Sequence, residues 1–312
     1  MAVHPTPGRE DKAMLGIALV IAAYFAFSFI DLFSKYLALA GIPAMQLVFM
    51  RYAGHLVLSG IVLFHHGDGL AELKTPKTGI VILRGLLLLG STVLNFWALR
   101  YLPLTLTTTF IFLAPIIVCA LSWPILGERV GPFRWTAIMV GFTGIIIAIR
   151  PFDAEFHWAT LMSFGSVICF ASYNVVTRHL AGVVNSSAMQ FYAGMTGTVV
   201  MAPFAFAVWT QPEQQVFWLM MIGMSFCGWL GHELLTRSYR FAEANKLIPF
   251  GYSLIIYMTL WSWLVFDHLP ELPTIIGGSI IVGSGLVIWA REAHLARIGR
   301  REAAKQVEGF KG

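Results

Sequence analysis

The sequence D-L-F-S-K-Y-L at residues 31–37 recurs as N-V-V-T-R-H-L at residues 174–180. The triplet A-M-Q at residues 44–46 likewise recurs at residues 188–190, so the two matches are offset by 143 and 144 residues. Similarity at a nearly constant offset is typical of a chain built from copies of one structural unit. The sequence therefore predicts two copies that together occupy most of the 312 residues.

The composition places both copies in a lipid bilayer. Hydrophobic residues make up 57% of the chain and charged residues 12%, against about 45–50% and about 25% in soluble domains. A membrane-spanning helix needs about 20 apolar residues, and ten such stretches leave too few residues for a soluble domain. We expect helices at residues 14–38, 43–64, 79–101, 104–126, 132–149, 158–180, 187–208, 216–237, 247–266 and 273–291.

Five helices per copy determine how the copies are related. Because five is odd, the second copy enters the membrane from the face opposite the first. The predicted fold is an all-α membrane protein with ten transmembrane helices arranged as two inverted five-helix repeats. Such repeats are frequent in secondary transporters, where substrate binds between the halves near the midplane. The expected segments are an N-terminal tail at 1–13, repeats at 14–150 and 151–291, and a basic tail at 292–312.

The distribution of basic residues predicts the direction of the helices. With both termini in the cytoplasm, 16 of the 21 Lys and Arg residues fall in cytoplasmic segments and three, Lys35, Arg100 and Arg150, lie on the opposite side. Cytoplasmic loops are enriched in Lys and Arg, so we expect a multi-pass protein of a bacterial-type inner membrane with both termini cytoplasmic. The net charge of +5 reflects these flanking residues, and we expect no nucleic-acid partner.

Metal, redox and nucleotide chemistry are not indicated. Cys119, Cys169 and Cys227 each lie in an apolar run without metal-ligand spacing, which favours small buried hydrophobes over a disulfide or metal site. Thr236 stands where the zinc-protease motif H-E-x-x-H needs its second histidine, and the sequence has no phosphate-binding G-x-x-x-x-G-K-[ST] loop. We therefore expect no cofactor, no catalytic residue and no ATP-driven step.

Ionisable side chains within the spans are candidates for function, because each costs about 2.5 kcal/mol or more at membrane depth. Asp31 and Lys35 lie four residues apart on one helix face, where they can neutralise each other. Asp31 is about 10 Å from the outer end of its helix at 1.5 Å per residue, and Arg51 enters from the same side. The three residues predict either substrate contacts in an outer vestibule or a structural clasp between the first two helices. Asn174 and Arg178 occupy the matching positions of the second copy, so we expect an asymmetric site.

Three further ionisable residues favour structural roles. Arg84 lies five residues into its helix from the cytoplasmic side, where we favour anchoring by extension of the side chain to the surface. His232 and Glu233 lie about one turn from the cytoplasm, which favours an interfacial position or a helix contact. Proton coupling is the alternative for this pair.

Aromatic and amide side chains extend the candidate site. Tyr24, Phe27 and Ser28 precede Asp31 at the spacing of one helical face, which places the acid on an aromatic stripe. Such rings can stack with a flat or cationic ligand, although aromatic side chains in membrane proteins are more often lipid-facing or interfacial. The candidate substrate-binding residues are Asp31, Lys35, Arg51, Tyr24, Asn95, Trp97, Tyr173, Asn174, Trp229, Tyr252 and Tyr257.

Small residues and prolines predict packing features. The spans at 132–149 and 273–291 carry glycines that allow close backbone approach, so we expect these two helices to form packing or homodimer surfaces rather than the pathway. Pro115 and Pro203 each lack a backbone donor and predict kinks in their spans. The glycines are those at 141, 144, 277, 278, 283 and 285.

Over residues 14–291 the chain resembles the ten-helix, EamA-type branch of the drug/metabolite transporter superfamily. The second half departs from the family at Phe266-Asp267-His268, where the family usually has Phe-Gly-Glu. The resemblance is carried by D-L-F-S-K-Y-L at 31–37, M-R-Y-A-G at 50–54, L-R-G-L-L-L-L-G at 83–90, A-L-R-Y-L-P-L at 98–104, L-A-P-I-I at 113–117, P-I-L-G-E-R at 124–129 and P-F-G-Y-S-L at 249–254.

This resemblance implies a secondary transporter of small organic molecules with a central cavity between the halves. Within the branch, the strings at 31–37 and 83–88 are most similar to uptake carriers for riboflavin and S-adenosylmethionine, and a flat heteroaromatic substrate agrees with the aromatic stripe. Amino-acid and drug exporters share the fold, while an integral-membrane enzyme and a channel are the contrasting classes. We expect the cavity to lie between the spans at 14–38, 79–101, 104–126, 158–180, 216–237 and 247–266.

Overall fold

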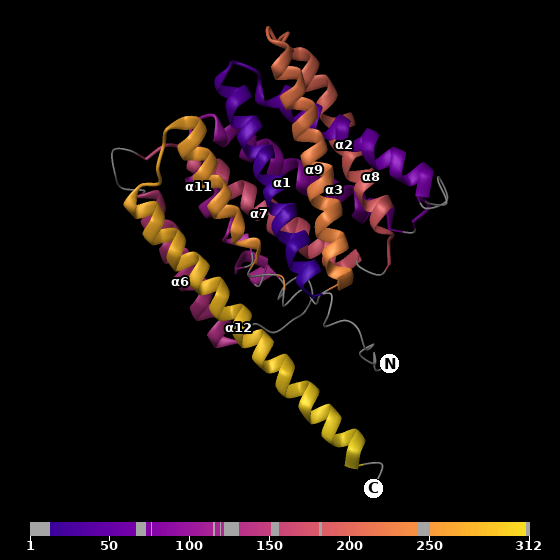
Figure 1. Ribbon diagram of the computed structural model, residues 1–312, viewed down its shortest axis with the longest axis vertical. Coiled ribbons are helices and arrows are strands. Elements are labelled where there is room, and N and C mark those ends of the chain that lie inside the picture. Colours follow the sequence, from indigo (N-terminus) through magenta and orange to yellow (C-terminus); the bar gives the residue numbers. More distant parts are fainter. Residues whose placement is uncertain are drawn as a thin grey trace.

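The computed structural model describes most of the chain and is helical throughout its regular parts (Figure 1). Within the described residues there are ten helices and no strand, which confirms the predicted all-α class. The described residues are 13–66, 73–75, 77–114, 116–118, 120–121, 131–150, 156–180, 183–241, 247 and 250–309.

Most helices begin and end close to the predicted bounds, because local signals mark their termini. Pro132 begins α6, where its missing N–H removes no intrahelical bond. The Asn185 side chain caps α8 by accepting a hydrogen bond from the Ser187 amide at 3.2 Å. The first repeat holds α1 (Ala13–Leu39), α2 (Ala44–His66), α3 (Thr78–Leu99), α4 (Leu104–Ile111) and α6 (Pro132–Ile149). The second holds α7 (Ala159–Leu180), α8 (Ser186–Ala207), α9 (Gln215–Phe241), α11 (Ser253–Phe266) and α12 (Leu272–Gly309).

The last helix, α12, continues well past the predicted end at residue 291. The chain beyond that point is rich in Ala, Arg, Glu and Lys, which are strong helix formers, so the segment predicted as a tail is helical to Gly309. Figure 1 shows that α1 begins and α12 ends at the same end of the bundle. This placement agrees with an even number of crossings.

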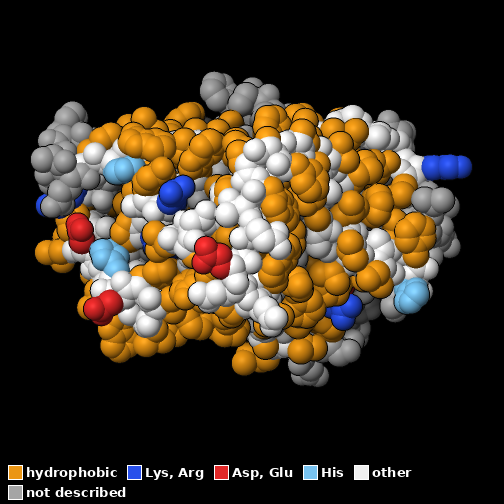
Figure 2. All heavy atoms as spheres, turned by 90° about the horizontal axis from the view of Figure 1, so that it is seen from above, with side chains coloured by type: hydrophobic (Ala, Val, Ile, Leu, Met, Phe, Trp, Pro, Cys, Tyr) orange, Lys and Arg blue, Asp and Glu red, His pale blue; other side chains and the backbone are white. Residues whose placement is uncertain are grey.

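Several helices have the length and hydropathy of membrane spans. Among the described residues, five helical segments are long and apolar enough to cross a membrane, and the segments Leu104–Val118, Trp135–Ile149 and Ser253–Phe266 are apolar but shorter. In the view from above, hydrophobic side chains dominate the visible surface and charged ones are scattered (Figure 2). The five segments are Met14–Leu39, Ala44–His65, Thr78–Leu99, Ala159–Thr177 and Leu272–Arg291.

The contacts between the two repeats are symmetric: if each helix is replaced by its counterpart in the other repeat, the same pairs of helices are in contact. α1 packs on α9 and α3 packs on α7, and the exchange converts one of these pairs into the other. The same holds for α2 on α9 and α3 on α8. α2 on α8, α4 on α11 and α6 on α12 each join a helix to its own counterpart. The packing therefore has the pseudo-two-fold relation of inverted repeats.

The fourth predicted span is interrupted, which corrects the expectation of a continuous helix at 104–126. α4 ends at Ile111, residues 112–113 form a turn, and helical backbone resumes at the next residue. Pro115 has no N–H to offer the Ile111 carbonyl, which explains the position of the break. Pro115 itself, Cys119 and residues 122–130, with the L-G-E string, lie outside the described residues. Pro203 lies within α8, and that helix continues through it.

The ninth predicted span, at 247–266, is interrupted at the equivalent position. Helical backbone at 250–251 gives way to a turn at Tyr252, and α11 begins at the following residue. Tyr252 lies 140 residues after Phe112, and the two rings pack together with centroids 5.2 Å apart. The two broken spans therefore meet at their breaks, as the discontinuous helices of secondary transporters do near substrate.

The outermost pair of helices, α6 and α12, pack against each other through two of the glycines named from the sequence (Figure 1). A Cβ atom on Gly144 would lie 2.8 Å from the Gly277 carbonyl oxygen, and one on Gly277 would overlap the Gly144 carbonyl oxygen. These glycines therefore serve packing within one chain and give no support to a homodimer surface. The expected exclusion of the two helices from the pathway stays a prediction.

We expect Gly277→Ala to lower the free energy of unfolding by about 1–3 kcal/mol, because an added methyl overpacks the contact between α6 and α12. Gly283→Ala on the same helix is the matched control, since a Cβ atom there meets nothing within 4 Å. The control should be neutral or slightly stabilising, because Ala is the better helix former. Thermal unfolding in detergent measures both variants, and equal stabilities would contradict the close contact.

Candidate functional site

The predicted stripe on α1 faces the second repeat. The Phe27 ring packs edge-on against the His232 ring of α9, with centroids 4.9 Å apart. One residue further, Ser28 Oγ accepts a hydrogen bond from Trp261 Nε1 of α11 at 2.9 Å. α1 therefore lies at the contact between the two halves.

Asp31 is buried, with 9% of its surface exposed, and its partner differs from the predicted ones. Its Oδ1 accepts a hydrogen bond from Asn95 Nδ2 of α3 at 2.9 Å. The expected neutralisation by Lys35 is wrong, because the Lys35 ammonium is bonded elsewhere. Arg51 is the cation that acts on the Asp31 carboxylate through space. The direct bond of Asp31 therefore joins α1 to α3 rather than α1 to α2.

Lys35 binds the end of α3. Its Nζ donates hydrogen bonds to the carbonyl oxygens of Leu99 at 3.1 Å and Leu102 at 2.5 Å. The last carbonyls of a helix have no intrahelical donor, and a cation is favoured beside them. The ammonium also lies 5.4 Å from the centroid of the Phe266 ring of α11. The Lys35 ammonium is thus bonded to backbone carbonyls that need a donor rather than to Asp31.

Arg51 joins α2 to α3. Its Nη1 donates to Thr92 Oγ1 at 2.7 Å, and the Tyr52 hydroxyl lies 2.9 Å from the same oxygen. The Arg51 guanidinium carbon lies 5.7 Å from the centroid of the Phe96 ring, in the range of a cation–π contact. The guanidinium is held mainly by neutral groups, so its positive charge stays available to an anionic neighbour.

Arg84 is not an anchor that reaches the surface, which corrects the interpretation favoured from the sequence. Only 3% of the residue is exposed. Its guanidinium donates to Thr177 Oγ1 at 2.7 Å, to the Tyr173 hydroxyl at 2.6 Å and to the Met189 carbonyl at 3.0 Å. These acceptors belong to α7 and α8, so Arg84 joins the two halves of the protein.

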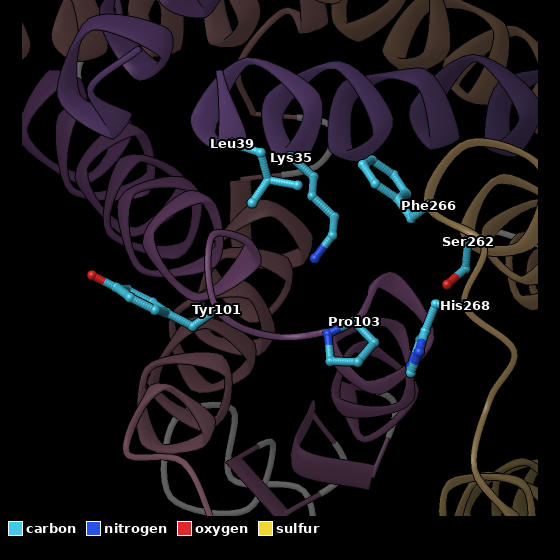
Figure 3. Close-up of a pocket in the computed structure, with 7 residues that line it drawn as sticks. All are labelled: Lys35, Leu39, Tyr101, Pro103, Ser262, Phe266 and His268. Atoms are coloured by element: carbon cyan, nitrogen blue, oxygen red, sulfur yellow. The ribbon is translucent and has the colours of Figure 1, made fainter. Parts of the chain in front are cut away.

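A pocket of about 280 Å³ opens where α1, the loop between α3 and α4, and α11 meet. Figure 3 shows the Lys35 ammonium pointing into this space and Ser262 and His268 on the facing wall. Tyr101 extends away from the other side chains (Figure 3). Asp31 and Arg51 do not line the pocket. The full lining is Lys35, Leu39, Tyr101, Pro103, Ser262, Phe266 and His268.

Three predicted tyrosines lie along the contact between the two halves. Tyr257 packs edge-on against Phe25 of α1, with centroids 5.1 Å apart. A Cβ atom on Gly251 would lie 3.0 Å from the Tyr24 hydroxyl, which places Tyr24 beside the break in the ninth span. The Tyr252 hydroxyl is buried and has no hydrogen-bond partner among the described residues.

The remaining candidates are not brought together. Asn174 donates to the Phe170 carbonyl of its own helix at 2.8 Å, so it does not repeat the link that Asp31 makes. Trp229 contacts the ring of Phe226, an outward-facing residue. Trp97 is half-buried on α3 and joins none of the other candidates. The structure thus joins Asp31 to Asn95 and places Tyr24, Tyr252 and Tyr257 along the contact between the halves, while Trp97, Asn174 and Trp229 lie apart from them.

Several site residues were missed from the sequence. Ser262 and His268 line the pocket, and Thr92 is the partner of Arg51, yet each is an ordinary polar residue of its segment. His55 is buried one turn after Arg51 on α2, and this spacing is a signal that sequence inspection could have used. No group of three or more His, Cys, Asp or Glu residues in the described ranges could hold a metal ion.

A family model matches both halves of the chain. The model for the EamA-like transporter family matches residues 14–150 and again residues 157–290. A solved crystal structure of another protein superposes with a TM-score of 0.58 over 88% of this chain and 98% of that chain, at 18% identity. The superposition indicates a shared fold.

Curated relatives cover almost the whole chain. A riboflavin transporter of Vibrio cholerae serotype O1 is 28% identical over 94% of this chain and 99% of its own length. An S-adenosylmethionine uptake transporter of Rickettsia felis is 25% identical over 91% of this chain and 96% of its own length. A pseudopaline exporter of Pseudomonas aeruginosa is 25% identical over 87% of this chain and 95% of its own length.

We expect Arg84→Lys to lower the free energy of unfolding by about 1–3 kcal/mol, although the charge is retained. A lysine cannot place donors on three separate acceptors as the planar guanidinium does. The matched control is Arg237→Lys, because Arg237 forms an exposed ion pair with Glu233, and such pairs contribute about 0–1 kcal/mol. Thermal unfolding in detergent compares the two, and an unaltered Arg84→Lys protein would contradict the role of Arg84 in joining the halves.

Proposed function

The chain belongs to the EamA-like transporter family, and from this premise we propose that it carries a flat heteroaromatic metabolite across the inner membrane by alternating access. Riboflavin and S-adenosylmethionine are the proposed substrates, and uptake is the proposed direction. The relatives named as riboflavin and S-adenosylmethionine uptake transporters support this choice. In this proposal the protein is a carrier, without a catalytic residue or a cofactor.

The pocket between the halves is the observation that supports the proposal best. Its first wall comes from α1 and the loop before α4, and its second from α11 and His268. A substrate there would touch both repeats, as expected for secondary transporters. Its volume of about 280 Å³ is slightly below the range for ligand sites, about 300–1,000 Å³. The pocket thus suits one end of a metabolite entering from the outer side.

The chemistry of the walls favours a substrate that has both a ring and a polar group. Phe266 offers a ring face, while Ser262 and His268 offer hydrogen bonds opposite the Lys35 ammonium. Deeper along α1, the Asp31 and Asn95 pair presents a carboxylate and an amide. We propose that a substrate moves from the Lys35 pocket toward this pair and then past the meeting point of the broken spans. We propose the remaining candidates as further substrate contacts. They are Arg51, Tyr24, Trp97, Tyr173, Asn174, Trp229, Tyr252 and Tyr257.

Export of a small metabolite is the second candidate function. The relative named as a pseudopaline exporter matches nearly the whole chain at an identity close to that of the uptake carriers. Amino acids and drugs are the substrates proposed for this alternative. Flux measured in both directions decides between the two.

Purified protein in proteoliposomes tests the function. We expect saturable flux of labelled riboflavin or S-adenosylmethionine that empty liposomes do not show. A flux limited to aromatic amino acids would favour the export alternative. Absence of flux for all of these compounds in both directions would contradict the proposed substrate class.

We expect both termini in the cytoplasm, because of the distribution of basic residues. An epitope tag at either end should then be protected from external protease in intact spheroplasts and cut after lysis. Cleavage of one tag in intact spheroplasts would contradict the predicted orientation.

We expect Asp31→Asn to insert normally and to lose transport by about tenfold or more, equal to about 1.4 kcal/mol. The substitution keeps the shape of the side chain and removes its charge. Glu271→Gln is the matched control, because Glu271 pairs with Arg150 at the exposed ends of α6 and α12. Normal transport by Asp31→Asn combined with easier unfolding in detergent would show that Asp31 is a structural link between α1 and α3.

A further inference from the structure

Two histidines from opposite halves of the protein meet inside the bundle. His55 lies near the middle of α2, and His232 lies on α9. Their ring centroids are 5.9 Å apart, with the rings nearly perpendicular at 84°. The terminal torsion of a histidine side chain is soft, so a small rotation turns a nitrogen of one ring toward the other. Glu233 is the neighbour of His232 in the sequence, but His55 is its neighbour in space.

Apolar and neutral side chains pack directly against the pair. The Phe27 ring of α1 covers His232, and Gln190 of α8 faces His55. His55 Nε2 and Gln190 Oε1 are both buried, and neither has a hydrogen-bond partner among the described residues. Buried polar atoms without partners are rare and indicate a missing ligand or a functional role. A neutral imidazole carries one N–H, and an added proton gives His55 a second, so that the ring can donate to Gln190 Oε1 and to His232 together.

The charges around the pair are mainly positive. Arg51 and Arg84 act on both histidines through space. The nearest carboxylate on α1 is Asp31, one turn beyond Phe27 and hydrogen-bonded to Asn95. The remaining groups on the packed helices are the Tyr52 hydroxyl on α2, which shares a hydrogen bond with Thr92, the neutral Gln190 on α8, and Glu233 on α9, which is paired with Arg237 at 2.7 Å.

From this arrangement we propose that His55 and His232 form a proton-binding site that couples the proposed transport to a transmembrane proton gradient. One proton is held between the two imidazoles, with Gln190 as an additional acceptor. Only histidine has an unperturbed side-chain charge change in the physiological pH range. The proposal rests on the transport function inferred above, but the proton site itself is testable without a substrate.

The position of the pair explains how proton binding and transport are linked. α2 belongs to the first repeat and α9 to the second, so the pair spans a contact between the halves. In the arrangement seen here the Phe27 ring packs on His232, and the guanidinium groups of Arg51 and Arg84 act on the pair through space. When α2 and α9 separate, water reaches the imidazoles and a proton binds more readily. A proton that binds one arrangement better than the other shifts the population of the two.

The first test reads proton binding directly. Histidine side-chain NMR signals of the purified protein are followed from pH 8 to pH 4, and those of the pair are assigned by their loss in His55→Gln and His232→Gln. We expect the two signals to titrate together, and each single variant to move the midpoint of the other histidine by about one pH unit or more. Independent titration of the two, or neutrality of both down to pH 4, would overturn the proposal.

The second test separates coupling from substrate movement. Proteoliposomes loaded with riboflavin or S-adenosylmethionine are assayed for exchange of labelled substrate and for accumulation driven by an imposed pH gradient. We expect His55→Gln and His232→Gln to keep exchange and to lose gradient-driven accumulation by about tenfold, an ordinary size for coupling between sites. His65→Gln is the matched control, because His65 is exposed near the end of α2.

The outcomes distinguish the two proposals. Gradient-driven accumulation that survives in both histidine variants would overturn proton coupling at this pair while leaving the transport function intact. Absence of exchange in the unaltered protein would instead contradict the proposed substrates, and the NMR titration would still decide whether the pair binds a proton.

Discussion

Polar and charged side chains inside a membrane protein must find their partners within the protein, because lipid offers none. This constraint organises the interior of the bundle. Lys35 satisfies carbonyls at the end of α3, Arg51 takes Thr92, and Arg84 binds three acceptors on α7 and α8. Each bond crosses from one helix to another. The charged residues therefore hold the helices in register, and their loss would leave buried groups unpaired at a cost of about 1–3 kcal/mol each.

Close helix packing supplies the rest of the contact between the halves. A Cβ atom on Gly54 of α2 would overlap the Ser225 side chain of α9, and one on Gly197 of α8 would overlap the Tyr52 ring. Ser225 in turn donates to the Met50 carbonyl at 2.8 Å. Packed interfaces of this kind rearrange between discrete states rather than deforming gradually. The same contacts that stabilise this arrangement would thus define one of the two states of an alternating carrier.

The pocket and the breaks of the two spans both lie between the halves. The pocket presents the Lys35 ammonium at one end of α1, and the Asp31 carboxylate lies one turn deeper on the same helix. The breaks of the fourth and ninth spans meet at Phe112 and Tyr252. A carrier must reorient with its site empty, and charges that already have partners make that step less costly. Buried charges that are already paired therefore suit the transport function proposed for this protein.

The sequence by itself determined the number and approximate bounds of the helices, the two repeats and the family, because apolar run length, repeat offset and helix-terminal residues are local properties. Tertiary structure decided which groups meet. Asp31 bonds Asn95 across 64 residues rather than Lys35 four residues away, and Arg84 turns inward to α7 and α8. Spacing along one helix shows which side chains share a face, but it does not show which acceptors a neighbouring helix presents to that face. Only the packing of distant segments supplies those partners. A buried carbonyl or hydroxyl without a donor is costly, so it takes the hydrogen bond that a nearby charged side chain would otherwise receive.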